Sequence, residues 1–347
     1  MNPLLKVEGI TCEYDDQVAV RNLGLEVEAG SLVCLLGPSG CGKTTVLRAI
    51  AGFHALSRGE IHIDGTLVSS TRFTLAPEQR HVGMVFQEHA LFPHMNASEN
   101  IAAGIRKLPA DERYQRIEEM LEKVGLSGFA DRYPHEMSGG QQQRIALARA
   151  LAPGPHLLLM DEPFSSLDLE LREKLGIEVH DLLKREGITS VLVTHDQMDA
   201  FALADFVGVM HAGEIVQWDT PYNLYHEPRT RFVADFVGDG VFVDGLIRDR
   251  HSIETELGIV EDSAIENFLN DAEVDVLLRP DDIVPCESPR VRARIVRKAF
   301  KGAEILYTLR LASGTRVLSL FPSHADHAVG EEVGVCLDAE HLVVFPK

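Results

Sequence analysis

The sequence predicts an α/β fold built around a phosphate-binding loop, followed by a small all-β domain. Three observations support this prediction. A glycine-rich stretch at 37–45 stands between an apolar strand pattern at 32–36 and a helical pattern at 46–50. Further apolar strands follow along the chain, each ending in polar residues. After Gly240 they give way to short strands with frequent turns.

The section before the phosphate-binding loop predicts a small β-subdomain. Strand patterns occur at 4–14, 17–20 and 24–27. Tyr14 is the one aromatic residue of this section. Its flat ring could stack on adenine, or it could be a half-buried strand residue, and its position alone does not decide between the two.

The phosphate-binding loop follows the pattern G-x-x-x-x-G-K-[ST]. Its glycines let several backbone N–H groups point at one anion, and the following helix adds a partial positive charge. We expect Lys43 to reach the β- and γ-phosphates, Thr44 to ligate Mg²⁺ and Thr45 to donate to a more distal phosphate. A plain glycine-rich turn with an exposed lysine is the alternative, and the flanking strand and helix disfavour it. The predicted nucleotide-binding residues are Gly37, Pro38, Ser39, Gly40, Cys41, Gly42, Lys43, Thr44 and Thr45.

Three later strands end in polar residues, namely Gln87, the pair Asp161-Glu162, and His195. Because a parallel sheet brings the carboxyl ends of its strands to one edge, we expect these residues beside the phosphate-binding loop. Asp161 is expected to hold Mg²⁺, and Glu162 to orient or deprotonate the attacking water. Gln87 could contact a metal-bound water, and His195 could donate to a γ-phosphate. Taken singly, they also fit a solvated glutamine, a strand-end capping pair and a structural histidine.

Residues 96–150 predict a helical subdomain inserted between these strands. Its last helix opens with the turn Ser138-Gly139-Gly140-Gln141, in which Ser138 is a good N-cap. This turn is a second anion-binding feature in a chain that already has one. One economical explanation is a dimer in which each subunit lends the turn to the nucleotide of the other.

The composition limits the class of protein. The net charge of −20 argues against nucleic-acid binding as the main function. Five widely spaced cysteines without a C-x-x-C pair predict free thiols in a reducing compartment. Residues 1–6 lack the apolar core of a signal peptide, and no apolar run approaches the roughly 20 residues of a membrane span. Any membrane role is therefore expected to come through partners.

Together with the stretch 165–168, these residues resemble the nucleotide-binding subunit of an ABC transporter. The resemblance covers about the first two-thirds of the chain. The Ser-Gly-Gly-Gln turn at this spacing from an Asp-Glu strand end is highly specific to that family. Met137 and Ser166 depart from the usual leucine and alanine of the family, and neither change removes a polar contact.

The resemblance implies roles for individual residues. Tyr14 resembles the aromatic that stacks on adenine, and Gln87 resembles the glutamine that contacts Mg²⁺ and senses the membrane partner. His195 resembles the switch histidine, and Asp168 the residue that couples the two sites of a dimer. The residues that resemble the contact with the γ-phosphate of ATP on the opposite subunit are Ser138, Gly139, Gly140 and Gln141.

The resemblance further implies a Mg²⁺-dependent ATPase coupled to transmembrane import, with ATP and Mg²⁺ as cofactors. Its implied partners are a second copy in a homodimer, integral membrane permease subunits and, indirectly, a substrate-binding protein, with no nucleic acid. The implied location is peripheral, on the cytoplasmic face of the inner membrane. A soluble ABC ATPase of DNA repair or translation is the alternative from another class, although the coiled-coil insertions or paired cassettes common there are not visible in the sequence.

Several stretches resemble importer ATPases for ferric iron, polyamines, sulfate, molybdate or sugars, among them 77–80, 90–94 and 236–238. Residues 132–135 and 163–165 are most similar to ferric iron importers, so ferric iron is the expected cargo and the other substrates are alternatives. The ATPase is not expected to touch the cargo, and its 15 histidines therefore do not bear on this choice.

The short strands after Gly240 predict a small β-barrel of the oligonucleotide-fold type. Residues 278–283 resemble the accessory domain of these importers, which stabilises the dimer. We therefore expect an ATPase domain at 1–238 and a β-barrel accessory or regulatory domain at 239–347.

Overall fold

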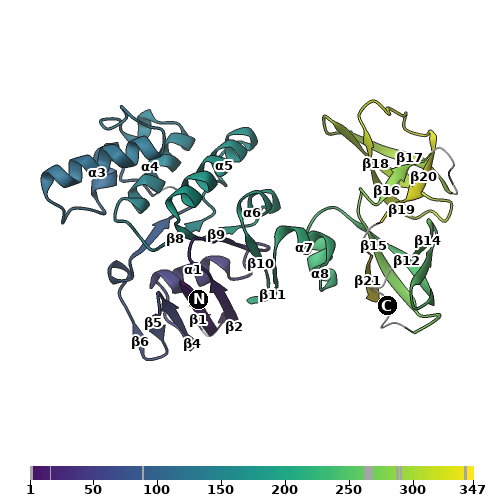
Figure 1. Cartoon of the computed structure of the whole chain (residues 1–347), viewed down its shortest axis with the longest axis horizontal. Helices are drawn as coiled ribbons and strands as arrows, with labels where there is room; N and C mark the ends of the chain where they lie inside the picture. Colours follow the sequence, from purple (N-terminus) through teal and green to yellow (C-terminus); the bar gives the residue numbers. More distant parts are fainter. Residues whose placement is uncertain are drawn as a thin grey trace. The chain divides into compact units, whose positions relative to one another are not determined.

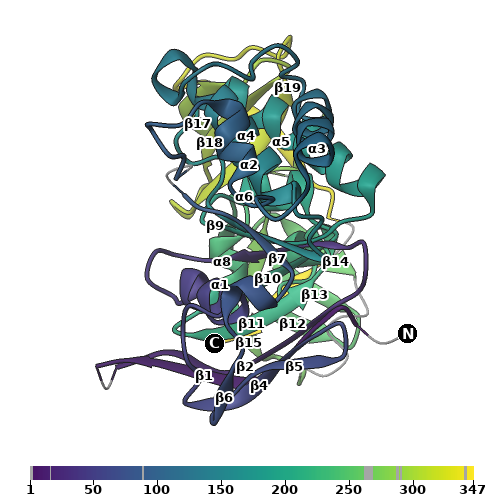
Figure 2. The ribbon, with the colours of Figure 1, turned by 90° about the vertical axis from the view of Figure 1, so that its left-hand side faces the viewer.

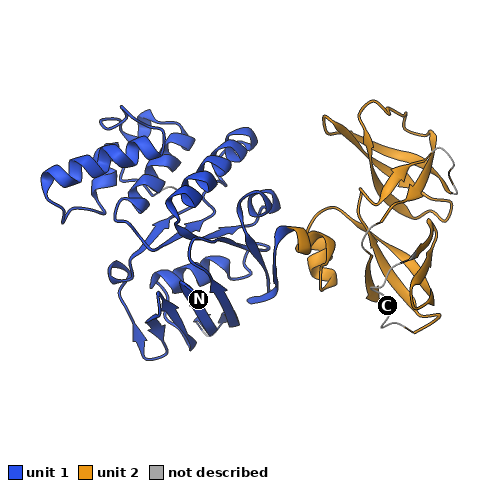
Figure 3. Ribbon diagram, in the orientation of Figure 1, with its two compact units in different colours: residues 1–221 blue, residues 222–347 orange. Residues whose placement is uncertain are grey.

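The computed structural model describes residues 3–15, 17–87, 90–261, 269–286, 289, 291–339 and 342–347. The chain divides into two compact units, residues 1–221 and 222–347 (Figure 3). Among the helices in the described ranges, none combines the length and the apolar character that a membrane span requires.

The segment between the first unit and the β-strands of the second forms two short helices, α7 (Pro221–His226) and α8 (Arg231–Phe236). The change in sequence pattern places the domain boundary after these helices, whereas the compact units divide after Pro221, the first residue of α7. The difference arises because Arg279 of the second unit donates hydrogen bonds to the carbonyl oxygens of Tyr225 in α7 and Ala234 in α8. These bonds attach both helices to the β-rich unit.

The centre of the first unit is a six-stranded sheet in the order β11-β10-β3-β9-β8-β7 (Figure 1). Neighbours from β10 to β7 pair in parallel, and β11 pairs antiparallel with β10. The residues of β3, β8 and β9 are buried throughout, as expected for a parallel sheet that is covered on both faces. The strands are β3 (Leu32–Leu36), β7 (Val82–Val85), β8 (Leu157–Asp161), β9 (Thr189–Thr194), β10 (Phe206–His211) and β11 (Glu214–Asp219).

The register of this sheet aligns the strand ends that matter for function. Leu36 at the end of β3 lies opposite Thr194 at the end of β9. Asp161 at the end of β8 lies opposite Val193. The carboxyl ends of three adjacent strands therefore meet at one edge, as the sequence predicted.

The single tryptophan of the chain, Trp218, lies on β11 at the margin of this sheet. A Cβ atom at Gly208 of β10 would stand 2.7 Å from the indole ring. Glycine at this position therefore lets the indole pack closely against the backbone of β10, the neighbour of β3.

An antiparallel sheet in the order β2-β1-β4-β5-β6 forms another layer of the first unit. Helix α1 (Lys43–Ala51) lies between this sheet and the central sheet, and the three layers share one apolar core (Figures 1 and 2). The strands are β1 (Leu5–Tyr14), β2 (Gln17–Val27), β4 (Arg58–Ile63), β5 (Thr66–Ser70) and β6 (Phe73–Thr74).

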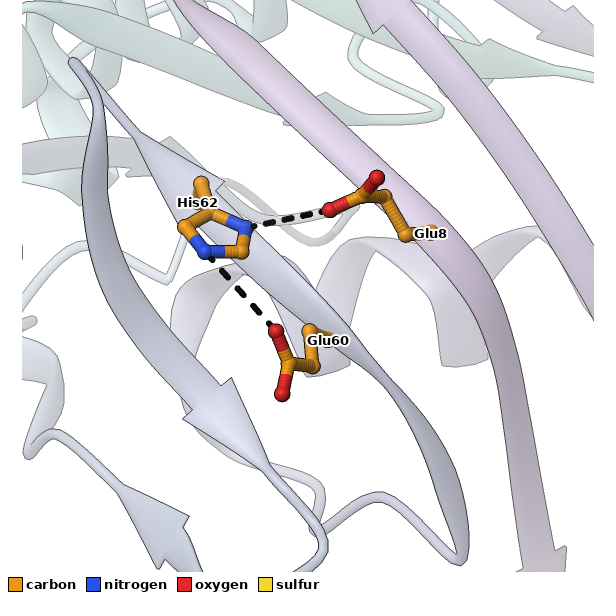
Figure 4. Close-up of side chains that lie close together, drawn as sticks. All are labelled: Glu8, Glu60 and His62. Carbon is orange, nitrogen blue, oxygen red and sulfur yellow. Dashed lines mark ion pairs between the residues drawn. The ribbon is translucent and has the colours of Figure 1, made fainter.

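The polar face of this sheet carries a small group of charged side chains (Figure 4). The ring of His62 lies between two carboxylates, with Nδ1 3.6 Å from Glu8 Oε2 and Nε2 3.9 Å from Glu60 Oε2. Lys6 Nζ lies 2.8 Å from the other oxygen of Glu8. The His62–Glu8 pair connects β4 to β1 on the solvent side, where ion pairs contribute little to stability.

Helices cover the opposite face of the central sheet (Figures 1 and 2). The predicted subdomain at 96–150 contains α2 (Ala97–Ala102), α3 (Ala110–Lys123) and α4 (Gly139–Leu151). The remaining elements of this layer are α5 (Leu169–Glu186) and α6 (Gln197–Leu203), and short 3-10 turns occur at Pro77–Gln79 and Pro134–Glu136. Helices α5 and α6 were not predicted from the sequence.

Beyond α7 and α8, the described residues of the second unit form β-strands, as predicted, which belong to two five-stranded sheets. One has the order β14-β13-β12-β15-β21 and the other β16-β20-β17-β18-β19. Tyr307 and Phe321 are fully buried in its apolar core, with ring centroids 5.0 Å apart. The strands are β12 (Val241–Asp249), β13 (Ser252–Thr255), β14 (Gly258–Glu261), β15 (Glu273–Leu278), β16 (Ile283–Pro285), β17 (Val291–Phe300), β18 (Glu304–Arg310), β19 (Arg316–Pro322), β20 (Glu332–Leu337) and β21 (Val343–Pro346).

Cys286 and Cys336 form a disulfide in the second unit, with Cα atoms 5.6 Å apart. This corrects the expectation that all five cysteines are free thiols, which holds for the buried Cys12, Cys34 and Cys41. The bridge forms because β16 and β20 pair antiparallel and place Val284 opposite Cys336, so that Cys286 comes near. Sequence spacing gave no indication of that pairing, because the two cysteines are 50 residues apart.

Candidate functional site

A cleft of about 520 Å³ opens at the carboxyl edge of the central sheet. Its walls come from β2, from the phosphate-binding loop with the start of α1, and from the turns after β7, β8 and β9. The lining residues are Ala19, Ser39, Gly40, Gly42, Lys43, Thr44, Thr45, Gln87, Glu162 and His195. All of them except Ala19 belong to the nucleotide-binding and catalytic residues that the sequence predicted.

The phosphate-binding loop takes a path that only glycine allows at two positions. A Cβ atom at Gly37 would stand 2.4 Å from the carbonyl oxygen of Met210. One at Gly42 would stand 2.5 Å from the carbonyl oxygen of Ala19, and Gly42 also has a φ of 106°. The backbone of the loop therefore lies close to the backbones of β10 and β2, immediately before the start of α1.

Lys43 enters α1 from the loop with only 5% of its surface exposed. Its ammonium donates hydrogen bonds to the carbonyl oxygens of Gly37 at 2.7 Å and Pro38 at 3.0 Å. Cys41 Sγ lies 3.8 Å from the same ammonium, and burial raises the pKa of this thiol. The loop thus holds a cation in its interior, and Cys41 serves there as a small, unreactive side chain.

Thr44 and Asp161 meet at the junction of the loop and β8. The Thr44 hydroxyl donates to Asp161 Oδ1 at 2.9 Å. Burial raises the pKa of Asp161, and the hydrogen bond from Thr44 partly opposes that effect. Adjacent ligands of an octahedral Mg²⁺ with bonds of 2.0–2.1 Å lie about 2.9 Å apart, so these two oxygens fit such an ion.

Glu162 follows β8 in a left-handed backbone conformation, with a φ of 46°. Its N–H donates to the carbonyl oxygen of Val193 at 2.9 Å, and its own carbonyl accepts from the Ser165 hydroxyl at 2.9 Å. A left-handed residue with a side chain costs about 1–2 kcal/mol, and these two bonds help to hold it. The turn places the Glu162 carboxylate on the wall of the cleft.

The Glu162 carboxylate lies between Gln87 and His195. Gln87 Nε2 donates to Oε2 at 3.3 Å, and His195 Nδ1 lies 3.1 Å from Oε1. Each residue follows a different strand, so the shared sheet edge brings them together as predicted. A carboxylate held in this way beside a phosphate-binding loop can accept a proton from a water molecule.

Arg172 on α5 supports the loop that carries His195, a role that was not predicted from the sequence. Arg172 Nε donates to Asp199 Oδ1 at 2.7 Å, and its Nη1 lies 3.0 Å from Asp196 Oδ2. Thr194 completes the group by donating its hydroxyl to Asp199 at 3.2 Å. The hydrogen bond to Asp199 is the main reason why the pKa of Arg172 is raised. A lone arginine on an unpredicted helix carried no pattern that could have revealed this role.

The turn at 138–141 and Asp168 lie elsewhere in the first unit. Ser138 caps α4, accepting from the Gln141 N–H at 3.4 Å and donating its own N–H to Gln141 Oε1 at 2.9 Å. Gly139 and Gly140 are the first two residues of α4, and Asp168 caps α5 through the Leu171 N–H at 3.0 Å. Among the described residues that line the cleft, none comes from this turn or from Asp168.

Tyr14 stands at the end of β1, outside the residues that line the cleft, and it is 42% exposed. Its ring centroid lies 4.4 Å from that of His54, with the planes inclined at 43°. One side of the phenol ring is therefore covered by an imidazole, and much of the rest faces solvent.

Two family models match the chain, that of the ABC transporter over residues 20–165 and that of the TOBE domain over residues 276–345. The putrescine transport ATP-binding protein PotG of Escherichia coli (strain K12) is 38% identical, over 99% of this chain and 96% of the relative. The spermidine/putrescine import ATP-binding protein PotA of Oleidesulfovibrio alaskensis is 41% identical, over 89% of this chain and 86% of the relative. That of Chromobacterium violaceum is also 41% identical, over 92% of each chain.

Two solved structures resemble the first part of the chain. CbiO1 from Clostridium perfringens, described as part of the ABC transporter complex cbiONQ, aligns with a TM-score of 0.61 and 28% identity over 65% of this chain and 92% of that chain. The ATP-binding cassette MJ0796, described as a dimer bound to ADP and Pi, aligns with a TM-score of 0.56 and 31% identity over 62% of this chain and 98% of that chain.

Proposed function

The chain belongs to the ABC transporter family as the ATP-hydrolysing subunit of an import system, and we propose that this system imports polyamines such as putrescine or spermidine. The three relatives described above are all named for these cargoes, and each aligns over most of its length. They give no support to ferric iron, the cargo expected from residues 132–135 and 163–165. The polyamine alternative therefore replaces it.

The observation that carries the catalytic part of the proposal is the Glu162 carboxylate held between Gln87 and His195 in the cleft. Glu162 takes a proton from the attacking water. At the same time the water oxygen bonds to the γ-phosphorus, and the bond between the γ-phosphorus and the oxygen that leaves with ADP breaks. His195 positions the γ-phosphate, and Gln87 would contact a water molecule bound to Mg²⁺.

The loop side of the cleft binds the nucleotide in this proposal. Lys43 exchanges its bonds to loop carbonyls for the β- and γ-phosphate oxygens, and Thr45 donates to a more distal phosphate. Thr44 and Asp161 supply the oxygens that would hold Mg²⁺. A bound Mg²⁺ neutralises charge on the β- and γ-phosphates during transfer. Tyr14 stacks on the adenine.

We also propose that two copies of the chain close head to tail on two ATP molecules. The turn 138–141 and Asp168 form the N-terminal ends of α4 and α5 and do not belong to the described lining of their own cleft, and a partner's nucleotide gives them a role. MJ0796, which this chain resembles, is described as a dimer. Closure and hydrolysis would act on integral permease subunits at the cytoplasmic face of the inner membrane, served by a substrate-binding protein.

The catalytic proposal is tested with Glu162→Gln in the full-length protein. We expect ATP binding to remain near the wild-type value, turnover to fall at least about a hundredfold, and an ATP-bound dimer to accumulate, because only the proton acceptor is lost. Binding is measured by calorimetry, turnover by phosphate release and the dimer by sedimentation. Glu118→Gln, an exposed glutamate on α3, is the matched control. Turnover of Glu162→Gln close to that of the control would rule out Glu162 as the principal base.

The cargo is tested by uptake in cells that produce the chain with its native permease. Loss of the chain should abolish uptake of labelled putrescine or spermidine and leave ferric iron uptake unchanged. Production of the Lys43→Ala variant should fail to restore uptake, whereas the wild-type chain restores it. Loss of iron uptake with normal polyamine uptake would overturn the proposed cargo and leave the ATPase assignment in place.

A further inference from the structure

Tyr14 occupies a place where the fold itself does little to hold its side chain. It is the last residue of β1, pairs with Gln17 across the hairpin and has exposed residues on both sides of it. The ring contact with His54 covers part of the phenol that the apolar core leaves uncovered. A ring meant to stack on a base gains from being fixed beforehand, because ordering it during binding costs free energy.

His54, in contrast, is attached to a rigid element. It follows α1, whose C-terminus is closed by Gly52 in a left-handed conformation with a φ of 91°. The buried Arg80 donates to the carbonyl oxygens of Ala49 at 3.1 Å and Ile50 at 2.8 Å, and thereby fixes the last turn of the helix. His54 is therefore held by a well-anchored helix end.

The same helix starts at the phosphate-binding loop with Lys43. Its nine residues span about 13 Å at 1.5 Å per residue. This helix and residues 52–54 after it connect Lys43, which reaches the phosphates in the proposed function, to His54, which contacts Tyr14. A helix therefore spans most of the chain between the phosphate end and the base end of the site.

The Nε2 atom of His54 is buried and has no hydrogen-bond partner among the described residues. Buried polar atoms without a partner cost free energy and are uncommon in folded proteins. An alanine or a leucine would avoid that cost if the position only filled space. A ring contact with Tyr14 at 4.4 Å accounts for keeping an imidazole here, because such pairs attract beyond their buried area.

We propose that His54 is a positioning residue for nucleotide binding, which acts by holding the Tyr14 ring in the orientation that receives the adenine. The inference rests on the proposed function, in which Tyr14 stacks on the base. His54 touches Tyr14 on one side, and the base occupies the side that faces solvent. His54 would thus affect recognition of the base and not binding of the phosphates.

The test measures dissociation constants by calorimetry for ATP and for inorganic tripolyphosphate, which has the same phosphates and no base. Full-length protein carrying Glu162→Gln is the parent, so that ATP is not consumed. His54→Ala is expected to weaken ATP binding about three- to tenfold, the range of an aromatic pair, and to leave tripolyphosphate binding unchanged. His54→Phe keeps a ring against Tyr14 and is expected to stay within about twofold of the parent. His156→Ala is the matched control. His156 precedes β8, at the amino ends of the parallel strands, and the variant should bind both ligands like the parent.

A double-mutant cycle then separates support of Tyr14 from a structural effect. In the Tyr14→Ala background, His54→Ala should have no further effect on ATP binding, because the ring it holds is gone. An unchanged dissociation constant for ATP in His54→Ala would overturn the inference. So would an equal loss for tripolyphosphate, or a full effect that persists without Tyr14. If Tyr14→Ala itself binds ATP like the parent, the adenine-stacking part of the proposed function fails, and that result is distinct from failure of His54 alone.

Discussion

Arg80 illustrates how one buried cation can organise several elements of the first unit. It is 2% exposed, and burial lowers the pKa of Arg80 to about 10, so the guanidinium stays charged at neutral pH. Its acceptors are the carbonyl oxygens of Ala49, Ile50, Val68 and Leu75 and the hydroxyl of Ser69. The side chain thereby joins the end of α1 to β5 and to Leu75, which follows β6.

Replacement of Arg80 should therefore destabilise the first unit. Arg80→Met keeps the apolar stem but leaves five acceptors without their donor, and we expect a loss of about 3 kcal/mol or more in the free energy of unfolding. Urea denaturation followed by far-ultraviolet circular dichroism measures it. Arg72 is an exposed arginine between β5 and β6. For Arg72→Met, the free energy of unfolding should stay within about 0.5 kcal/mol of the wild-type value. Equal effects of the two substitutions would contradict the central place given to Arg80.

Asp282 is the residue from which a pH dependence of the second unit is expected. Burial raises the pKa of Asp282 from 3.8 to about 6, while the backbone N–H of Arg279 donates to its carboxylate at 2.6 Å. Between about pH 4 and pH 6 the folded state holds a proton that the unfolded state has released. The stability that this proton contributes is present below pH 4 and is lost as the pH rises through 6.

Asp282→Asn keeps an oxygen acceptor for Arg279 and removes the titration. We expect the variant to lose the fall in stability between about pH 4 and pH 6 and to be more stable than wild type at pH 8. Hydrogen–deuterium exchange of the segment 273–286, compared between the two proteins at each pH, gives the measurement. Identical pH profiles for both proteins would show that Asp282 does not titrate in this range.

At the scale of elements, the sequence predicts what has a strong local pattern. The apolar run of β3 has the expected bounds, and β8 and β9 end at the polar residues that were predicted for their ends. The 18-residue α5 was missed because its buried positions are separated by many charged ones, although Asp168 and Gly187 mark its two ends as caps. Strands β16 and β21 are short and exist through pairing with distant partners, which a single stretch of sequence does not reveal.

The same division applies to the site. Residues at strand ends and in the glycine-rich loop were predictable, because strand, turn and helix patterns place them. Arg172, Arg80 and His54 were not, since each acts through contacts with segments far away in the sequence. Their roles depend on tertiary packing, for which the local sequence holds no periodicity.

The pairing of β16 with β20 supports a prediction about the disulfide. Cys286 and Cys336 close a loop of about 50 residues, so the bridge is expected to stabilise the second unit by roughly 2–4 kcal/mol. Adding dithiothreitol to the wild-type protein should lower the free energy of unfolding of this unit by that amount, as measured by urea denaturation. The double variant Cys286→Ser and Cys336→Ser should start at the lower stability and should not respond to the reductant. A wild-type protein that is equally resistant with and without reductant would argue against a stabilising bridge.

At the scale of the whole molecule, each cleft of the proposed dimer depends on two chains. One chain supplies Lys43 and the catalytic groups, and the turn 138–141 comes from the other. The described lining of the cleft in a single chain contains only the first set. The two sets can therefore be disabled in separate chains.

Mixing two inactive variants tests this arrangement. Lys43→Ala and Ser138→Arg should each hydrolyse ATP at a small fraction of the wild-type rate. In a mixed dimer, one cleft combines the intact Lys43 of one chain with the intact Ser138 of the other, so an equal mixture should regain up to about a quarter of the wild-type rate if chains pair at random. Phosphate release is the measurement. A mixture no more active than the average of its two components would contradict the shared cleft.

The position of Trp218 has a practical consequence. The indole lies on β11 in the first unit, packed on the strand next to β3, and it is the only tryptophan in the chain. Indole fluorescence is therefore an intrinsic optical label for one unit, two strands from the phosphate-binding loop. It would follow loosening of the ATPase sheet in solution without an attached dye and without a contribution from indoles in the β-rich unit.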